Sequence, residues 1–204
     1  MQRESESRRL AKIVAEAKRL GATEARLISP SEVVVDDRVR LKCLVPLCSA
    51  YGRNLMCPPK LPSVDEFRKA LSSFRRGIIL QVESDLDSSD KAGKTLTKDV
   101  CEEIELRTGS MRWQTELHKI VSQIETFAFK EGFHLATGFV GGECVLCDRC
   151  VAMDGSNECR RPFEARPSME AMGIDVVETC RRVGLPLKLS SESKVRWTGL
   201  VLLD

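Results

Sequence analysis

Four cysteines in one stretch of the sequence are spaced so that they could surround a single inorganic centre. Their pattern is Cys144-x2-Cys147-x2-Cys150-x8-Cys159. Ferredoxin-type chains hold most of an iron–sulfur cube with a C-x2-C-x2-C run, because the cube takes one thiolate for each iron. The pattern matches this run at three ligands, and the fourth follows a longer gap than in bacterial ferredoxins. The stretch therefore predicts an iron–sulfur site at these four cysteines.

A structural zinc ion is the alternative for the same four thiols. Zinc takes four tetrahedral ligands, usually as two separated pairs, and Cys144–Cys147 with Cys150–Cys159 would provide such pairs. The overlapping triplet favours the cube over zinc. Free thiols in a hydrophobic core are a poorer interpretation, because charged residues make this loop polar. These residues are Asp148, Arg149 and Asp154.

A second cysteine group lies upstream, in a stretch rich in glycine and proline. Cys43, Cys48 and Cys57 are separated by gaps of four and eight residues. Three thiolates leave one position of a metal centre to be filled from elsewhere or left open for a substrate. The candidates for a fourth ligand are Cys101, Cys180, Cys159 and a carboxylate. The alternative interpretations are a zinc site or, for Cys43, burial as a small hydrophobic residue.

The other groups that could do chemistry favour structural roles. His118 and His134 lack ligand spacing to each other or to a carboxylate, so a hydrolase based on histidine is not supported. The sequence has no phosphate-binding loop of a recognised kind. Cys180 lies on the apolar face of an expected helix and is predicted to be a core residue, and Cys101 is either core or unassigned.

Composition narrows the class of protein. Hydrophobic residues make up 42% of the 204 residues, and the formal charges sum to +2, which argues against a nucleic-acid partner. No apolar stretch reaches the ~20 residues that span a membrane, and residues 1–9 are too polar for a signal peptide. We therefore expect a cytoplasmic protein, in which thiols stay reduced and clustered cysteines indicate metal binding.

Hydrophobic periodicity predicts an α+β fold, with a small mixed sheet covered by helices on one face and two cysteine-rich metal-binding loops. We expect one domain over residues 1–204, with the first metal loop at 43–61 and the second at 141–167. Helices are expected at residues 4–20, from Ser63, at 96–130 and from Ser168 to 183. Strands are expected at residues 25–29, 33–35, 39–43, 77–82, 133–140, 185–189 and 195–203.

Several motifs together resemble a family catalogued as predicted metal-binding proteins, domain of unknown function 2284, from anaerobic bacteria and archaea. The motifs are Cys43-x4-Cys48-x2-Tyr51-Gly52-x4-Cys57-Pro58-Pro59, the four-cysteine run with Arg160 and Pro162 after it, residues 165–176, and Trp197-Thr198-Gly199-Leu200-Val201-Leu202. The resemblance covers the chain from about Cys43 to its end. It implies metal binding by the same seven cysteines and supplies no settled reaction.

The leading hypothesis is an iron–sulfur protein with one or two clusters of the [4Fe-4S] type. Its role would be electron transfer, or that of a redox accessory in anaerobic metabolism, with a redox partner protein. Two alternatives stay open. One is a zinc-stabilised binding module without redox function. The other is an enzyme with an open iron site at Cys43, Cys48 and Cys57.

Overall fold

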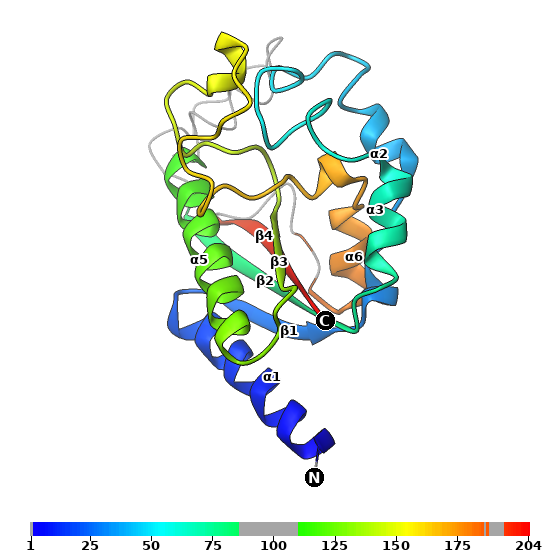
Figure 1. Cartoon of the computed structure of the whole chain (residues 1–204), viewed down its shortest axis with the longest axis vertical. Helices are drawn as coiled ribbons and strands as arrows, with labels where there is room; N and C mark the ends of the chain where they lie inside the picture. Colours follow the sequence, from blue (N-terminus) through cyan, green and yellow to red (C-terminus); the bar gives the residue numbers. More distant parts are fainter. Residues whose placement is uncertain (1, 86–109, 186, 188–193) are drawn as a thin grey trace.

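A four-stranded antiparallel sheet forms the centre of the fold in the computed structural model, which describes residues 2–85, 110–185, 187 and 194–204 (Figure 1). The strand order is β1-β2-β4-β3. The strands are β1 (Glu24–Ile28), β2 (Arg76–Asp85), β3 (Thr137–Val140) and β4 (Lys194–Leu203). The α+β prediction is confirmed. The sheet is antiparallel at every strand pair rather than mixed.

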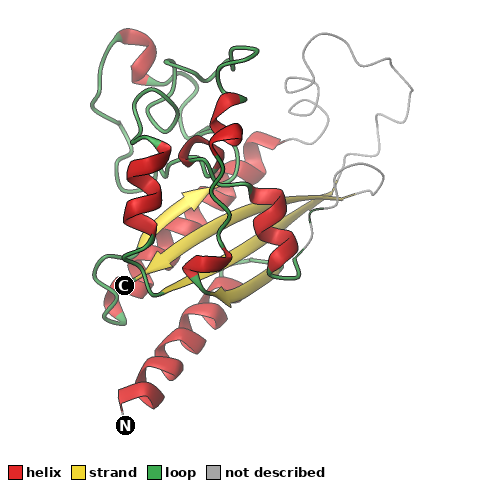
Figure 2. Ribbon diagram, turned by 90° about the vertical axis from the view of Figure 1, so that its right-hand side faces the viewer, coloured by secondary structure: helices red, strands yellow, loops and turns green. Residues whose placement is uncertain are grey.

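The two long central strands are buried on both faces. In β2, Ile78 and Leu80 belong to the hydrophobic cluster on one face, while Ile79 belongs to the cluster on the other. Successive side chains of a strand point to opposite faces, so the continuous apolar run in β2 requires cover on both sides. Helices accordingly pack on both faces, and the expectation of helices on one face is wrong (Figure 2).

Each face has its own pair of helices. The cluster containing Ile78 includes side chains of α1 (Gln2–Arg19) and α5 (Ser110–Lys130). The cluster containing Ile79 includes side chains of α3 (Val64–Leu71) and α6 (Val176–Arg182). The expected helix at 4–20 is thus confirmed. The expected helix at 96–130 is confirmed from Ser110 onward, and its earlier part lies outside the described residues.

The start of α3 follows the prediction from local sequence. The Ser63 side chain accepts a hydrogen bond from the Glu66 amide, and the Glu66 side chain accepts one from the Ser63 amide. This capping box satisfies amides that have no partner within the helix. Val64, Phe67 and Leu71 then form the buried face of α3.

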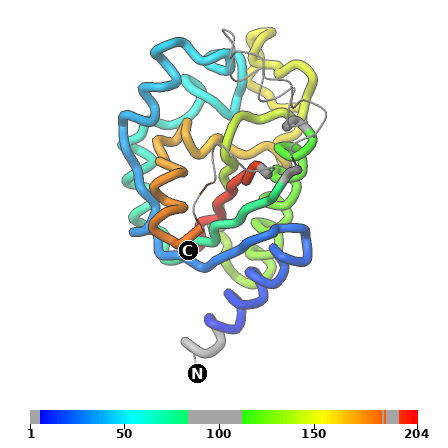
Figure 3. Tube along the Cα trace, turned by 180° about the vertical axis from the view of Figure 1, so that it is seen from behind, coloured from blue at the N-terminus to red at the C-terminus, as the bar shows by residue number. Residues whose placement is uncertain are grey.

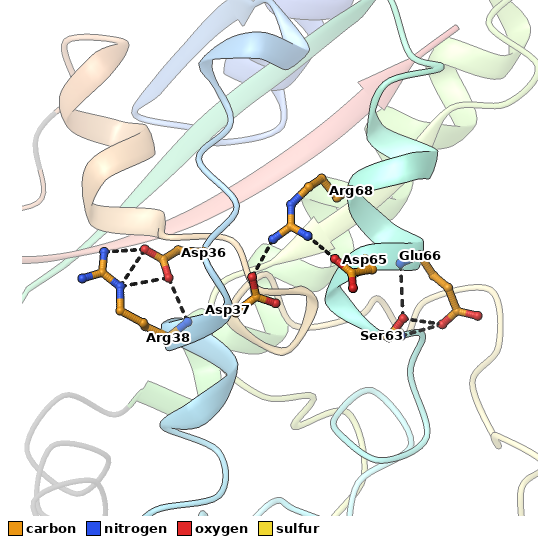
Figure 4. A network of polar contacts seen from close by, with 7 residues as sticks. All are labelled: Asp36, Asp37, Arg38, Ser63, Asp65, Glu66 and Arg68. Atoms are coloured by element: carbon orange, nitrogen blue, oxygen red, sulfur yellow. Dashed lines mark hydrogen bonds and ion pairs between the residues drawn. The ribbon is translucent and has the colours of Figure 1, made fainter.

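The predicted strand at 39–43 is wrong, because a helix forms there instead. Asp36 caps α2 (Asp37–Leu41) by accepting a hydrogen bond from the Arg38 amide. Such side-chain bonds to the backbone compete with strand pairing, and the apolar Leu41 is 55% exposed. Arg68 of α3 forms an ion pair with Asp37, which links α3 to α2, and a second ion pair with Asp65 of its own helix (Figure 4).

The single helix predicted from Ser168 to 183 is also wrong, because two elements form. A short 3-10 helix, η4 (Glu170–Met172), ends at Gly173, whose φ of 84° is a left-handed conformation that glycine adopts readily. The Asp175 side chain then accepts a hydrogen bond from the Glu178 amide and starts α6. Two further 3-10 helices are η1 (Pro30–Glu32) and η3 (Val151–Asp154).

The remaining strand predictions differ mainly in length. The strand expected at 25–29 is β1, and the strand expected at 77–82 extends to ten residues in β2. The strand expected at 133–140 is confirmed only over Thr137–Val140. No strand forms at residues 33–35, where Val35 makes only an isolated bridge with Ile174. Of 185–189, residues 185 and 187 lie outside any strand, and residues 186, 188 and 189 lie outside the described residues. The strand expected at 195–203 is β4.

Both cysteine-rich loops lie beyond the same end of the sheet, as the views from the front and from behind show (Figures 1 and 3). The second loop follows β3, as predicted. The first follows the helix α2 rather than a strand. Among the helices that the structure describes, none is long and apolar enough to cross a membrane.

We expect Gly199→Ala to lower the free energy of unfolding by about 1–3 kcal/mol, which is typical of overpacking. A Cβ at Gly199 would lie 2.6 Å from Cγ2 of Val121 and 3.2 Å from Cδ1 of Leu117, so α5 would have to move away from β4. Urea denaturation measures the change. Val121→Ala in the same chain opens space for the new methyl group, so the double variant should be more stable than the sum of the single effects predicts. Strictly additive effects would contradict the close approach of α5.

Candidate metal centre

The seven cysteines of the two predicted sites line two neighbouring cavities, in the grouping that the sequence predicts. Cys144, Cys147, Cys150 and Cys159 line one cavity of about 20 Å³ together with the segment Asn54–Met56 of the first loop. We call it the four-thiol cavity. Cys43, Cys48 and Cys57 line the other, of about 290 Å³, which we call the three-thiol cavity.

The second loop is closed at its base by the backbone of Val140. The Val140 amide donates to the Pro167 carbonyl over 3.0 Å, and the Val140 carbonyl accepts from the Met169 amide over 2.7 Å. The chain therefore leaves the sheet after β3 and returns beside the same residue. The next amide, that of Gly141, donates to the Thr198 carbonyl of β4 over 2.7 Å. These bonds fix both ends of the four-cysteine stretch to the sheet.

Within the second loop, short-range contacts fold the chain around the thiols. Arg160 donates to the Arg149 carbonyl over 2.8 Å, and Arg149 pairs with Asp154 at 2.7 Å. The Arg161 amide donates to Sγ of Cys159 over 3.4 Å. Hydrogen bonds from backbone amides to cysteine sulfur stabilise the thiolate and influence the potential of iron–sulfur centres.

The first loop turns its thiols to one side by doubling back. The Cys48 amide donates to the Cys43 carbonyl over 3.1 Å. The Gly52 amide donates to the Pro58 carbonyl over 2.8 Å, and Gly52 has a φ of 72°. A left-handed residue suits the tight turn between Cys48 and Cys57.

A buried asparagine joins the two loops. The Asn54 side chain is 5% exposed, and its Nδ2 donates to the Cys144 carbonyl over 2.8 Å. Its Oδ1 accepts from the Met56 amide over 3.0 Å. The Ser168 amide donates to the Met56 carbonyl over 3.1 Å, which ties the first loop to the base of the second. These hydrogen bonds therefore tie the two cysteine-rich loops together.

Burial holds several of these thiols in the protonated form when no metal is bound. Desolvation is the main cause that raises the pKa of Cys43 and Cys57, and it raises the pKa of Cys144 to about 11. The negative charge of Glu143 adds to the increase in the pKa of Cys57. Because metals bind thiolates, a metal must displace protons from these groups, and its affinity should decrease as the pH falls.

The described side chains form no preassembled site for a single metal ion. Among the His, Cys, Asp and Glu side chains of the described residues, no three converge closely enough to hold one metal ion. A zinc ion needs its ligands about 2.0–2.3 Å from one point, whereas a cube spreads one thiolate to each iron. The four-thiol cavity has room for a body about the size of one water molecule, so a cluster would require the loop to open outward.

Two of the candidates for a fourth ligand at the three-thiol cavity lie elsewhere. Cys159 lines the other cavity, while Cys101 lies outside the described residues and stays a candidate. Cys180 is fully buried in the core, with its Sγ 3.7 Å from Gln81 Nε2 and Thr198 Oγ1, so the prediction of a core role is confirmed. Two carboxylates, Glu143 and Glu170, line the three-thiol cavity.

The structural roles predicted for the two histidines agree with their surroundings. His118 is fully buried on α5, and desolvation lowers its pKa to about 4. Backbone groups of Glu143 and Glu164 act in the opposite direction and raise the pKa of His118. Among the described residues, neither ring nitrogen has a hydrogen-bond partner. His134 is exposed, and its ring lies 5.2 Å from that of Phe129.

Sequence reasoning missed the polar residues that complete the two sites. Asn54 gave a weak signal, because it lies between two cysteines of the first loop. Glu143 directly precedes Cys144, and Glu170 lies in the segment that follows the second loop. Gln114 on α5 gave no signal, because a polar residue beside an apolar helix stripe is ordinarily exposed.

Comparison with protein families gives one match. The model described as "Predicted metal-binding protein (DUF2284)" matches residues 26–203. No curated protein and no solved structure matches the chain significantly.

We expect Asn54→Ala to lower the free energy of unfolding by about 1–3 kcal/mol, because the buried carbonyl of Cys144 loses its partner. The variant should also retain less metal when it is purified without air. Asn157→Ala is the matched control, since Asn157 also joins the loops by accepting from Lys60 Nζ over 2.8 Å but is exposed. It should change the free energy of unfolding by less than about 0.5 kcal/mol. An equal loss of unfolding free energy in the two variants would contradict a particular role for Asn54 in joining the loops.

Proposed function

Because the chain belongs to this family of predicted metal-binding proteins, we propose that it is a cytoplasmic iron–sulfur protein. In this proposal its seven clustered cysteines hold [4Fe-4S] centres, and it exchanges electrons with a partner redox protein in anaerobic metabolism. The observation that carries the proposal is the gathering of all seven cysteines at two adjoining cavities. An iron–sulfur cluster supplies one-electron redox chemistry, and the residues of this chain determine where that chemistry takes place.

The sequence spacing of the cysteines at the four-thiol cavity favours iron over zinc in this proposal. The overlapping spacing of Cys144, Cys147 and Cys150 is the ferredoxin-type run, whereas structural zinc sites usually take their ligands as two separated pairs. Four thiols around one cavity match the number of irons in a cube. The amide of Arg161 that donates to Cys159 provides the kind of bond that stabilises cluster sulfurs.

Two centres are favoured over one shared centre. The thiols divide four and three between the cavities. Asn54 lines the four-thiol cavity, and its two hydrogen bonds are made to the backbone of both loops. A single larger centre would have to displace this buried amide, which would leave its partners unsatisfied.

The position of the loops suits electron exchange with another protein. Cys48 is exposed, and the cysteines of the four-thiol cavity are half-buried. Exposed cations lie on the same two loops, which favours a partner with an acidic docking surface. They are Arg53, Lys60, Arg149, Arg160 and Arg161, and they outnumber the exposed carboxylates of these loops, Asp148, Asp154 and Glu158.

The experiment that tests the proposal is elemental analysis of iron, acid-labile sulfide and zinc in protein purified without air, together with the visible spectrum. Two cubes would give about eight irons and about eight sulfides for each chain. About half of that would leave the three-thiol cavity without a cube. Zinc without iron or sulfide would replace the proposal with a zinc-stabilised binding module.

A pair of cysteine substitutions tests the assignment of ligands. Cys147→Ser should remove the centre at the four-thiol cavity, which is about half of the iron if two cubes are present. Cys180→Ser also replaces one thiol but should leave the iron content unchanged, because Cys180 contacts Gln81 and Thr198 in the core. Circular dichroism checks that both variants are folded. An equal loss of iron in both would contradict the assignment.

A further inference from the structure

A partly buried ion pair joins the end of the second loop to the helix α5. Arg166 of this loop donates to the Glu125 carboxylate through two atoms, from Nε to Oε2 over 2.9 Å and from Nη2 to Oε1 over 2.7 Å. The Arg166 side chain is 11% exposed and the Glu125 side chain 24%. Charges withdrawn from water attract one another more strongly, and are screened less by salt, than charges on the surface. Two parallel hydrogen bonds also fix the geometry of the pair.

The pair packs against the strand β3. The Gly138 amide donates to Oε2 of Glu125 over 2.5 Å. A Cβ at Gly138 would lie 2.9 Å from that oxygen and 3.4 Å from Cδ of Arg166, so the absence of a side chain lets the pair approach the strand. The Glu125 carboxylate thus binds a guanidinium and a backbone amide together. As a result, α5, β3 and the end of the second loop meet at this carboxylate.

Arg166 connects this junction to the wall of the four-thiol cavity. Its Nη1 donates to the carbonyl of Ala165 over 2.8 Å. Ala165 is buried and lines the four-thiol cavity together with the four cysteines. The ion pair therefore holds the residue next to this wall, and its charges lie one residue away from the wall.

His118 of α5 is a common neighbour of Arg166 and of the segment that carries Cys144. Desolvation is the main cause of the low pKa of His118, and the positive charge of Arg166 also lowers it. The backbones of Glu143 and Glu164 influence the same pKa in the opposite direction. Glu143 directly precedes Cys144 in the chain. The charge of Arg166 thus acts inside the fold, on a side chain that both ends of the second loop approach.

We infer that the Glu125–Arg166 pair positions the second loop around the four-thiol centre and, through its two charges, sets the reduction potential of that centre. This inference rests on the proposed function, in that the four thiols hold an iron–sulfur cluster. Net charge is one of the factors that determine the potential of such a cluster. In the intact pair each charge offsets the other, and loss of one partner leaves the other charge uncompensated in a partly buried place. Both residues are positioning residues, which act through the loop and not as ligands.

Substitution of each partner by glutamine tests the inference. The measurement is an EPR-monitored redox titration of anaerobically purified protein, in which the signal of the four-thiol centre is the one that Cys147→Ser lacks. Glu125→Gln leaves Arg166 unpaired and should shift the midpoint potential upward, because reduction adds a negative charge to the cluster. Arg166→Gln leaves Glu125 unpaired and should shift the midpoint potential downward. The double variant should return towards the value of the unaltered protein.

Glu131→Gln is the matched control. Glu131 follows the last residue of α5, is 19% exposed and pairs with Lys12 of α1 at 3.0 Å, so it joins α5 to α1 instead of to the second loop. This variant should leave the midpoint potential unchanged. A purely structural role of the pair predicts loss of iron without shifts of opposite sign. Shifts of the same sign, no shift, or single variants that hold no cluster would overturn the assignment of the potential.

Hydrogen exchange in the metal-free protein tests the positioning role separately. Arg166→Gln should speed the exchange of the backbone amides of residues 160–168, because the end of the loop loses its bonds to α5. Glu131→Gln should leave this exchange unchanged. Equal exchange in Arg166→Gln and in the unaltered protein would overturn the positioning role.

Failure of this inference can be told apart from failure of the proposed function. Protein that contains iron and sulfide, but whose potential does not respond to the glutamine variants, would retain the iron–sulfur function and lose the role of the pair in setting the potential. Protein without iron or sulfide would lose the iron–sulfur function and, with it, the assignment of the potential. The exchange of residues 160–168 would still decide whether the pair positions the loop.

Discussion

The backbone hydrogen bonds of Val140 are the constraint on which the arrangement of the two cysteine groups depends. The Val140 amide donates a hydrogen bond to the Pro167 carbonyl, and the Val140 carbonyl accepts one from the Met169 amide. The 26 residues between Val140 and Pro167 therefore begin and end at one point of the sheet. Closing a loop of this length costs conformational entropy, and the fold meets that cost with backbone bonds at the edge of a buried sheet. The amide of Ser168, which follows Pro167, donates a hydrogen bond to the Met56 carbonyl and brings the first loop to the same point.

The features that could be predicted from the sequence are those encoded by short-range patterns. The capping box at Ser63 and the apolar face after it predicted α3, since both act within one or two turns of the chain. The spacing of Cys144, Cys147 and Cys150 predicted that they lie together, because short gaps keep the thiols close in nearly any conformation. The division of the seven cysteines into two groups has the same origin.

The errors arose where a local signal was overruled by another. Val39, Leu41 and Cys43 alternate like a strand, yet the Asp36 side chain satisfies the start of a helix instead. At Gly173 a left-handed turn ends one short helix, and Asp175 starts the next, although the apolar spacing continues across both. The cover on both faces of the sheet could have been inferred from the continuous apolar run Ile78–Leu80, since a strand with one solvent-facing side alternates.

The polar groups of the site could not be predicted, because each becomes meaningful only through a distant contact. Gln114 and Gln123 are both glutamines of the helix α5. Only the fold places Gln114 against Gly142 and leaves Gln123 exposed. The resulting asymmetry between the cavities bears on their roles. Four thiols and the segment Asn54–Met56 line the smaller cavity, whereas three thiols and two carboxylates are among the residues that line the larger one. The two cysteine groups thus have different surroundings, although Asn54 joins their loops through the backbone of Cys144.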